Sequence, residues 1–340
     1  AADGSTATPS LANSFATELY TGNGGTQSVT TGFKPDFSWL KRRDNAIGNT
    51  NNLLFDSVRG AGERLISNTT TVEGTFTDEL TSFITNGFTI GADASTNGSG
   101  GTFVSWNWKA GGTPSINTDG QNTSALVSAN PAAGFSIATF TGNGTNGSSV
   151  GHGLNAVPEL WIWKRTSVAA SDWIVAGKDI NNYQGYLTLN GSGSTVIDTA
   201  MLAPDSSKIK FPTGSPTFNG SGQGAIIYSF HSVAGYSKVG SYIGGGATNV
   251  TVNVGFAPSY IMIKSTSAGR NWLIYDNKRE TGTVPYENDT VLFADGNSPE
   301  VTGNVQRGIQ FTSTGFVLNQ NYGNTNGSGE THIFLAIKEN

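Results

Sequence analysis

An internal threefold repetition is the feature that most restricts what this chain of 340 residues can fold into. One marker of the repeat is the tetrapeptide Asn-Gly-Ser-Gly at Asn97, Asn219 and Asn326, each leading into an apolar run. Counted from each asparagine, the seventh, ninth and eleventh following residues are apolar in every copy. Because Asn-Gly favours the two-residue turn of a β-hairpin, these segments are predicted to be hairpin turns that lead into core strands.

Two more markers recur in the same order along the chain. A proline is followed six residues later by a lysine in the pairs Pro35 and Lys41, Pro158 and Lys164, and Pro258 and Lys264. The second and fourth residues after each proline are apolar, which is the alternation of a strand with one buried face. The other marker is an aromatic strand that ends in a glycine-rich turn.

The markers predict an all-β protein of three tandem β-sandwich or jelly-roll-like domains related by the internal repeat. The prolines are spaced by 123 and then 100 residues, and the excess lies in a stretch that carries Gly-Gly-Thr-Pro. The predicted boundaries are a first domain at 1–110 with a short N-terminal arm, a linker at 111–132, and further domains at 133–232 and 233–340. A weaker marker aligns a mid-repeat strand at 54–56, 173–175 and 272–274.

Composition restricts the partners of such a protein. Only 13% of the residues are charged and the formal net charge is −5, so the chain lacks the basic surface that nucleic acids and anionic membranes attract. The sequence has no cysteine, which excludes disulfides and thiolate metal sites. It also has no apolar run long enough to cross a bilayer as a helix. We therefore expect stability to come from packing or assembly.

Four segments carry a resemblance to a known family: residues 19–24, 32–37, 55–60 and 106–112. This run resembles a family of tailed-phage structural proteins, common in marine phage genomes, that carry a repeated β-domain of uncharacterised function. The similarity covers the first two repeats, whereas the third, from Tyr236, departs from the pattern. The resemblance implies a virion component, as a fibre, receptor-binding or capsid-surface protein, and it supplies no catalytic residues.

Two short motifs match catalytic or nucleotide-binding patterns only in form. The glycines at 142–147 match the dinucleotide fingerprint, and residues 147–151 match a nucleophile elbow centred on Ser149, with His152 next to it. Both motifs require a following helix, which the sequence does not predict. The histidines His152, His231 and His332 fall at different places of the repeat, which favours solvated or strand-end roles over a recurring catalytic or metal site.

Acidic residues give no aligned pair that would act as acid and base on a glycosidic bond. The examples considered are Asp44, Asp56, Asp276 and Asp295. The stretch 295–297 with Glu300 has oxygen donors for Ca²⁺, but a turn explains its spacing better, so no metal and no cofactor are predicted.

Trp161 and Trp163 are the predicted ligand-binding residues. They place two indoles two residues apart on the variable face of a strand, where flat aromatic rings can stack on sugars or anchor a partner subunit. The competing interpretation is that a second sheet or a neighbouring repeat covers this face.

The sequence thus favours a non-enzymatic structural protein of the outer virion surface, in capsid decoration or in the tail or fibre, that acts through protein–protein contacts. Its predicted partners are other virion proteins and further copies of itself, with a trimer favoured, and neither nucleic acid nor an inserted membrane. The alternative is a glycan-binding adhesin that recognises a host-surface glycan, and a third hypothesis is a glycan-cleaving enzyme.

Overall fold

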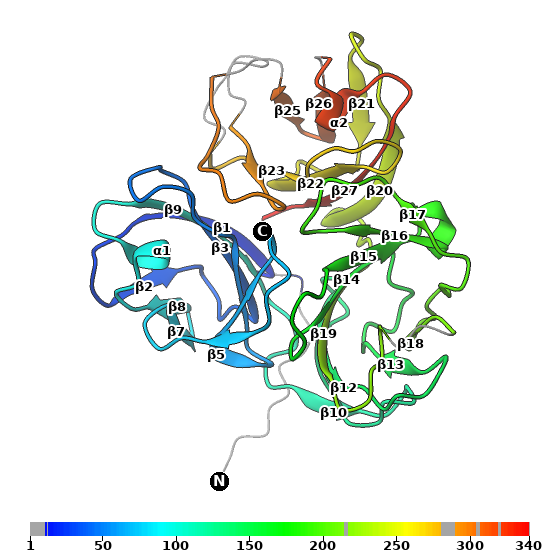
Figure 1. Ribbon diagram of the computed structural model, residues 1–340. Coiled ribbons are helices and arrows are strands. Elements are labelled where there is room, and N and C mark those ends of the chain that lie inside the picture. The colour runs from blue at the N-terminus through cyan, green and yellow to red at the C-terminus, as the bar shows by residue number, and fades with distance from the viewer. Residues whose placement is uncertain are drawn as a thin grey trace.

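The computed structural model describes residues 11, 13–213, 217–279, 290–303, 307–318 and 321–339, so the start of the predicted short N-terminal arm lies outside the described residues. Within these residues the fold is all-β, with antiparallel sheets, two α-helices of four residues each and one 3-10 helix. Three units related by the repeat lie around a common centre, as the blue, green and yellow-to-red ribbons of Figure 1 show. The predicted fold class, with three β-sandwich units related by an internal repeat, is confirmed.

Unit 1 pairs a larger sheet, in the order β1-β9-β3-β4-β5-β6, with a smaller sheet, β2-β8-β7. Its elements are β1 (Phe15–Thr21), β2 (Gln27–Thr30), β3 (Phe37–Arg42), β4 (Leu53–Asp56), β5 (Gly60–Ile66), β6 (Gly74–Thr75), β7 (Leu80–Ile84), β8 (Gly87–Ile90), α1 (Ala94–Asn97) and β9 (Thr102–Trp108).

Unit 2 has a sheet in the order β10-β11-β12-β19-β14-β15-β16-β17 and a two-stranded sheet, β13-β18. Its elements are β10 (Ser115–Asn117), β11 (Ala125–Asn130), β12 (Phe135–Thr141), β13 (Ser149–Gly151), β14 (Leu160–Arg165), β15 (Ile174–Gly177), η1 (Asn181–Tyr183), β16 (Gly185–Thr188), β17 (Val196–Ile197), β18 (Lys208–Lys210) and β19 (Gly224–Phe230).

Unit 3 has a sheet in the order β20-β27-β22-β23-β24 and a smaller one, β21-β26-β25. Its elements are β20 (Ser237–Ile243), β21 (Val250–Asn253), β22 (Tyr260–Ser265), β23 (Leu273–Asp276), β24 (Leu292–Phe293), β25 (Ile309–Thr312), β26 (Gly315–Leu318), α2 (Gly323–Asn326) and β27 (Thr331–Ile337).

The same connectivity recurs in the larger sheet of each unit. The last strand (β9, β19 or β27) lies between the first strand of the repeat and the strand that follows the marker proline. Pro35, Pro158 and Pro258 therefore precede equivalent strands, β3, β14 and β22. The repeat found in the sequence is thus a repeat of topology.

The stretch predicted as a linker, 111–132, is part of the fold. It contains β10 and β11, and β11 pairs with five residues of β12, so that unit 2 has a wider sheet than its neighbours. The prediction was wrong because these strands are short and contain several Ser and Asn residues, a composition that also suits loops.

One hydrophobic core is shared by all three units. Each apolar position that the repeat aligns in the strands after the proline and after Asn-Gly-Ser-Gly belongs to this central cluster. The opposite faces of the larger sheets pack on the smaller sheets and form a separate outer core in each unit. Strands such as β3 and β22 are consequently buried along their full length. The three sandwiches are fused at their inner faces.

The Asn-Gly-Ser-Gly segments are not hairpin turns. Asn97 ends α1, and Gly98 has φ −53°, which a type I′ turn does not allow. The Asn97 amide instead donates to the Gly91 carbonyl at 2.7 Å and accepts from the Asn23 backbone N–H at 2.9 Å. A Cβ on Gly22 would lie 2.2 Å from the Gly98 carbonyl oxygen, so this close approach requires glycine.

Candidate functional site

The predicted ligand-binding pair, Trp161 and Trp163, lies inside the protein. Their exposed fractions are 1% and 0%, and both indoles belong to the outer core of unit 2, where they pack near Phe218. The smaller sheet, β13-β18, contributes side chains to the same core and covers this face. This arrangement is the competing interpretation, in which a second sheet covers the two indoles. Two buried indoles cannot stack on a sugar from solvent, so they are removed as a candidate binding site.

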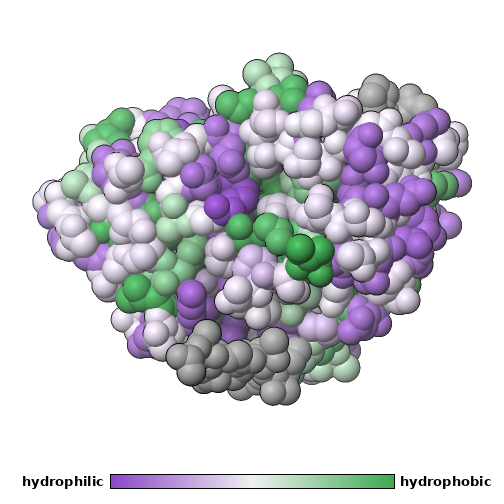
Figure 2. All heavy atoms as spheres, turned by 90° about the horizontal axis from the view of Figure 1, so that it is seen from below, coloured by the Kyte–Doolittle hydropathy of each residue, from purple (hydrophilic) through white to green (hydrophobic). Residues whose placement is uncertain are grey.

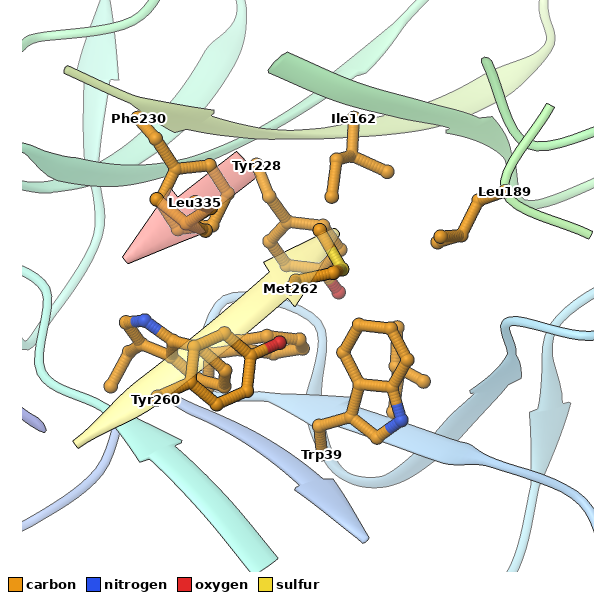
Figure 3. A pocket seen from close by; sticks show the side chains of 11 residues that line it. Trp39, Ile162, Leu189, Tyr228, Phe230, Tyr260, Met262 and Leu335 are labelled. Atoms are coloured by element: carbon orange, nitrogen blue, oxygen red, sulfur yellow. The ribbon is translucent and has the colours of Figure 1, made fainter. Parts of the chain in front are cut away.

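The centre of the molecule holds a small void between side chains of all three units. Figure 3 shows Trp39, Tyr228 and Tyr260 directed into it from units 1, 2 and 3. Its cavity volume is about 10 Å³ and its lining is apolar. A void of this size is at the lower limit for one water molecule and has no room for a ligand. The centre is therefore a packed junction.

A ring of equivalent hydrogen bonds joins each unit to the one before it. The Trp173 indole N–H of unit 2 donates to the Ile66 carbonyl of unit 1 at 2.8 Å. The Trp272 indole of unit 3 donates to Thr188 of unit 2 at the same distance.

The equivalent donor in unit 1 closes the ring. The Asn52 amide donates to the carbonyls of Phe293 and Gly296 in unit 3, at 3.0 and 2.8 Å. The same strand position thus makes the same inter-unit contact three times, and the first and last units of the chain are joined like the others.

A second contact between neighbouring units is a side-chain hydrogen bond at two of the three junctions. The Tyr228 hydroxyl of unit 2 donates to Asp56 of unit 1, and the Trp106 indole of unit 1 donates to Asp276 of unit 3, both at 2.9 Å. Burial beside Asp56 raises the pKa of Tyr228 well above its usual value, so the phenol keeps its proton.

The equivalent of these aspartates in unit 2 is Gly177. Strand pairing shows this, because Asp56, Gly177 and Asp276 each face the second residue after the marker proline. The residue that would donate to Gly177 is Leu335 of unit 3, which is apolar and buried. Donor and acceptor have therefore been replaced together at the third junction.

Each buried aspartate also holds an arginine three residues later. Arg59 contacts Asp56 and Arg279 contacts Asp276, with 2.6 Å between guanidinium and carboxylate in both pairs. In unit 2 the corresponding residue, Ile180, is buried in the central core. These paired charges are committed to the junctions and are not available to a substrate.

The marker lysines, Lys41, Lys164 and Lys264, are fully buried. Loss of solvation lowers the pKa of Lys41 to about 7 and those of Lys164 and Lys264 to about 8. Two of them also bridge units. The Lys41 ammonium donates to the Asn297 carbonyl of unit 3 at 3.1 Å, and Lys264 donates to Gly193 of unit 2 at 2.8 Å.

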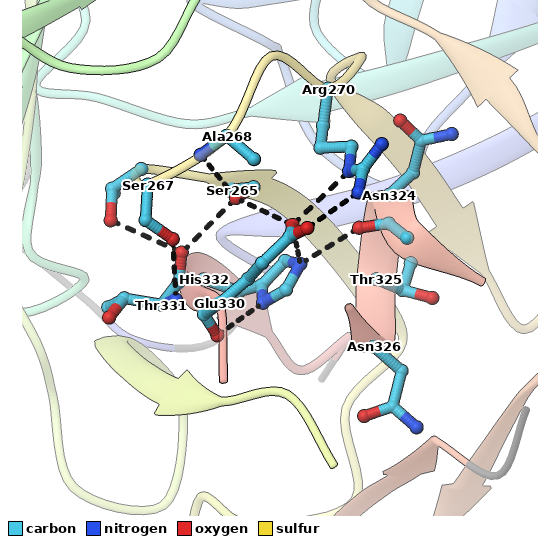
Figure 4. A network of polar contacts seen from close by, with 12 residues as sticks. Ser265, Ser267, Ala268, Arg270, Asn324, Thr325, Asn326, Glu330, Thr331 and His332 are labelled. Atoms are coloured by element: carbon cyan, nitrogen blue, oxygen red, sulfur yellow. Dashed lines mark hydrogen bonds and ion pairs between the residues drawn. The ribbon is translucent and has the colours of Figure 1, made fainter. Parts of the chain in front are cut away.

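A polar cluster in unit 3 comprises Ser265, Arg270, Glu330 and His332, and Figure 4 shows its contacts. Glu330 accepts from Arg270 Nη2 at 2.5 Å and from the Ser265 hydroxyl at 3.2 Å. His332 Nε2 lies 3.9 Å from the same carboxylate. The serine hydroxyl thus contacts the carboxylate and not the imidazole, which is not the arrangement that activates a nucleophile.

The His332 ring is committed to the fold as well. Its nitrogens lie 3.1 Å from the Glu330 carbonyl and 3.3 Å from that of Gly323, and the ring stacks on Tyr242. Burial lowers the pKa of His332, which favours the neutral imidazole. His152 is also fully buried, and only His231 is partly exposed. Of the solvated or strand-end roles predicted, the strand-end role fits His152, which directly follows β13, and His332, the second residue of β27, and both side chains are buried.

The remaining sequence motifs have structural roles. Ser149 begins β13, and its hydroxyl accepts from the Gln121 backbone N–H at 3.2 Å, so it is not the nucleophile of an elbow. Asp295 accepts from the Trp272 N–H at 3.1 Å, and both Glu300 oxygens are held by Arg43 at 2.8 and 2.9 Å. Within the described residues, no three histidine or acidic side chains are close enough to hold a metal ion.

One open surface pocket contains polar side chains that the fold does not fully use. It lies where unit 2 continues into unit 3 and has a volume of about 420 Å³. We call it the surface pocket. It is lined by Val157, Glu159, Lys178, Asn182, Tyr183 and His231.

The wall of the surface pocket is held by three contacts. Glu159 Oε2 accepts from the Ser232 N–H at 2.7 Å, and the Tyr183 hydroxyl donates to the Pro158 carbonyl at 3.0 Å. The Lys178 ammonium lies 3.9 Å from Glu159 Oε1. Burial, with nearby Glu159, raises the pKa of Tyr183 to about 12, so the phenol is neutral at physiological pH.

The sequence analysis missed two features of the structure: the register of the mid-repeat strand and the surface pocket. The mid-repeat strand was aligned two residues out of register in unit 1, because Asn52, and not Leu54, is equivalent to Trp173 and Trp272. The correct register aligns two Asp-x-x-Arg segments, which would have identified the buried ion pairs. The surface pocket had no signal in the sequence beyond Asn181-Asn182.

Comparison with known protein families places all three units in one family. A comparison with curated proteins gives no match. None of the helices in the described ranges is long and apolar enough to cross a membrane. One family model matches residues 10–340 and therefore includes the third unit, which the sequence resemblance had left out. The chain belongs to this family, which is described as a domain of unknown function, DUF7483.

Proposed function

We propose that this protein is a structural component of a bacteriophage virion surface, in capsid decoration or in the tail or fibre, and that it acts through protein–protein contacts without catalysis. The resemblance to tailed-phage structural proteins supports the location. The geometry supports the mode of action, because the buried charged groups described above are used to join the units to one another.

The observation that carries the proposal concerns the sheet edges. Among the described residues, the three most exposed large hydrophobic side chains are Ile116, Ile197 and Ile243. Each lies in a strand at the edge of its sheet, β10, β17 or β20. An edge strand presents unpaired backbone groups, and an exposed isoleucine beside them adds apolar area, which together suit docking of another chain.

The rest of the surface lacks one dominant apolar patch on the face seen in Figure 2. Hydrophobic residues form small groups there, separated by polar and neutral residues. This distribution favours several limited contacts over one extensive interface. Multiple small contacts suit a protein that is held in a repeating lattice, where multivalency raises the effective affinity.

The test is to purify phage particles that encode this chain and to compare wild type with Ile116→Lys, Ile197→Lys and Ile243→Lys variants. We expect the wild-type chain in purified particles by mass spectrometry, and reduced incorporation of at least one variant that keeps the wild-type melting temperature. Absence of the wild-type chain from particles would rule out the virion location. Normal incorporation of all three variants would rule out edge docking. The trimer expected from the sequence stays a prediction, which light scattering of the purified chain tests.

A further inference from the structure

The surface pocket is built by a connection whose shape differs between units 1 and 2. In unit 1, only residues 57–59 separate β4 from β5, whereas in unit 2 residues 178–184, which include η1, separate β15 from β16. The two connections are nearly equal in length, because Leu54 pairs with Leu65 in unit 1 and Val175 pairs with Leu187 in unit 2. The unit 2 connection supplies Lys178, Asn182 and Tyr183 to the pocket wall. The strand pairing seen in unit 1 is thus replaced in unit 2 by a loop that forms a hollow.

The connection between β15 and β16 contains an unusual backbone. Asn181, Asn182 and Tyr183 have φ values of 48°, 51° and 65°, so three consecutive residues other than glycine adopt the left-handed conformation. Each such residue is disfavoured, and runs of them are rare outside sites where the surrounding structure enforces them. The buried Tyr183 ring and its hydrogen bond to Pro158 hold the run in place.

The equivalent position in unit 1 shows what the pocket acid would do in an ordinary repeat. Asp36, which follows the marker proline as Glu159 does, is buried and accepts from the N–H groups of Ala110 and Gly112 and from the Ser57 hydroxyl. Glu159 uses only Oε2 in the corresponding way, on Ser232. Its second oxygen is left facing the pocket, near Lys178.

Three polar groups therefore converge on the pocket. The Lys178 side chain is 60% exposed and 3.9 Å from Glu159, too long for a hydrogen bond, so the ammonium can donate to a ligand while Glu159 Oε1 accepts from it. Asn182 is exposed and offers an amide donor and acceptor. Val157, with 43% of its surface exposed, adds an apolar side.

The charges around the pocket select among ligand classes. A strongly anionic ligand would meet Glu159 and Asp179, and a cationic one would meet Lys178. A hydroxyl group can accept from the ammonium and donate to the carboxylate at the same time. The volume of about 420 Å³ lies in the range of small-molecule sites.

We propose that the surface pocket is a binding site for an uncharged saccharide, with Lys178, Glu159 and Asn182 as its hydrogen-bonding residues and Val157 as its apolar contact. The site is distinct from Trp161 and Trp163. The proposal goes beyond the virion function and does not depend on it, because a purified chain binds or fails to bind sugar wherever it is located.

The experiment uses the purified full chain in ligand-observed NMR. The probes are glucose, galactose, mannose, rhamnose and N-acetylglucosamine with their β-linked disaccharides, and sialic acid and glucosamine serve as charged comparators. We expect at least one neutral sugar to bind. Asn182→Gly keeps the left-handed backbone but removes the amide, so it should weaken binding about tenfold, the usual effect of one lost hydrogen bond. Lys178→Ala should weaken it at least as much.

Asn181→Gly is the matched control, since it relaxes the same backbone run but Asn181 bonds locally to the Gln184 carbonyl and not into the pocket. It should bind sugar like wild type. Three results would each overturn the proposal: no neutral probe binds, only the charged comparators bind, or Asn181→Gly and Asn182→Gly weaken binding equally while both melt like wild type. Absence of the chain from purified phage particles would overturn the proposed virion function but would not affect the sugar-binding result.

Discussion

At the level of single residues, the three units have diverged in coordinated groups. Where unit 3 has the buried pair Asp276 and Arg279 beside the Trp106 donor of unit 1, unit 2 has Gly177 and Ile180. A buried ion pair is costly to break, because removing one partner leaves an uncompensated charge, but replacing both partners by apolar groups can be nearly neutral. The change from one set to the other therefore had to involve both positions.

Asp276→Gly alone is expected to lower the free energy of unfolding by roughly 3 kcal/mol, because the buried Arg279 loses its closest carboxylate and keeps only Glu300, 3.0 Å away. Arg279→Ile alone should be destabilising for the converse reason. The double variant, which copies unit 2, should be more stable than either single variant, since Glu300 keeps its contacts with Arg43. Urea unfolding of the four proteins measures this, and a double variant whose destabilisation equals the sum of the single effects would contradict coupling.

The buried lysines predict an unusual pH dependence. Burial lowers the pKa of Lys41 to about 7 in the folded protein, against 10.5 for an ordinary lysine. Between these values the unfolded chain binds more protons than the folded one, so the free energy of unfolding rises with pH, by up to about 1.4 kcal/mol per pH unit for one such group. Below pH 7 both states are protonated and this contribution no longer changes.

Thermal unfolding between pH 7.5 and 9.5 tests this directly. The melting temperature should rise over that interval, and Lys41→Met should make the rise smaller. Lys178→Met is the control, because the Lys178 side chain is exposed to solvent. This variant should show the same rise in melting temperature as the wild-type protein. A melting temperature that falls with pH in the wild-type protein, or an identical rise in Lys41→Met, would show that the lysine is not buried as a neutral amine.

At the level of elements, the two glycine-rich segments of each unit form one structure. The asparagines Asn97, Asn219 and Asn326 use their amides to bind the turn that follows the first strand. The donated bonds end on backbone carbonyls such as Gly91 and Gly246. Each asparagine therefore satisfies main-chain groups from a distant part of its unit, which explains why this residue type recurs in the repeat.

Asn97→Asp is expected to destabilise the protein by roughly 1–3 kcal/mol, because a carboxylate cannot donate to the carbonyl groups that the buried amide satisfies. Asn182→Asp, at an exposed asparagine, is the control and should change stability by less than about 0.5 kcal/mol. Guanidinium unfolding at pH 7 compares the two. Equal stability of Asn97→Asp and wild type would contradict the role of this amide.

Strand faces were predictable from the sequence, and their surroundings were not. The alternation after Pro35 and after Asn97 identified the positions that point to the centre, because a strand with period two shows its buried face directly. It did not show that the opposite face is buried too, so the pattern favoured Trp161 as a binding residue although its ring is buried. The pocket around Asn182 could not be predicted, since it arises where the chain departs from its own repeat.

At the level of the whole molecule, the three sandwiches share one core and are tied in a ring. The hydrogen bond from Asn52 to Phe293 joins unit 1 to unit 3. The inner face of the larger sheet is therefore covered in each of the three units. A unit separated from the others would expose the inner face of its larger sheet. We therefore expect the units to fold and unfold together.

Differential scanning calorimetry of the full chain tests this most directly. A shared core predicts a single transition in which the van't Hoff and calorimetric enthalpies agree, with a total of about 240 kcal/mol near 60 °C for a chain of this size. Three resolved transitions, each with the roughly 70 kcal/mol expected of a domain of about 100 residues, or two transitions that share the total enthalpy, would contradict a common core.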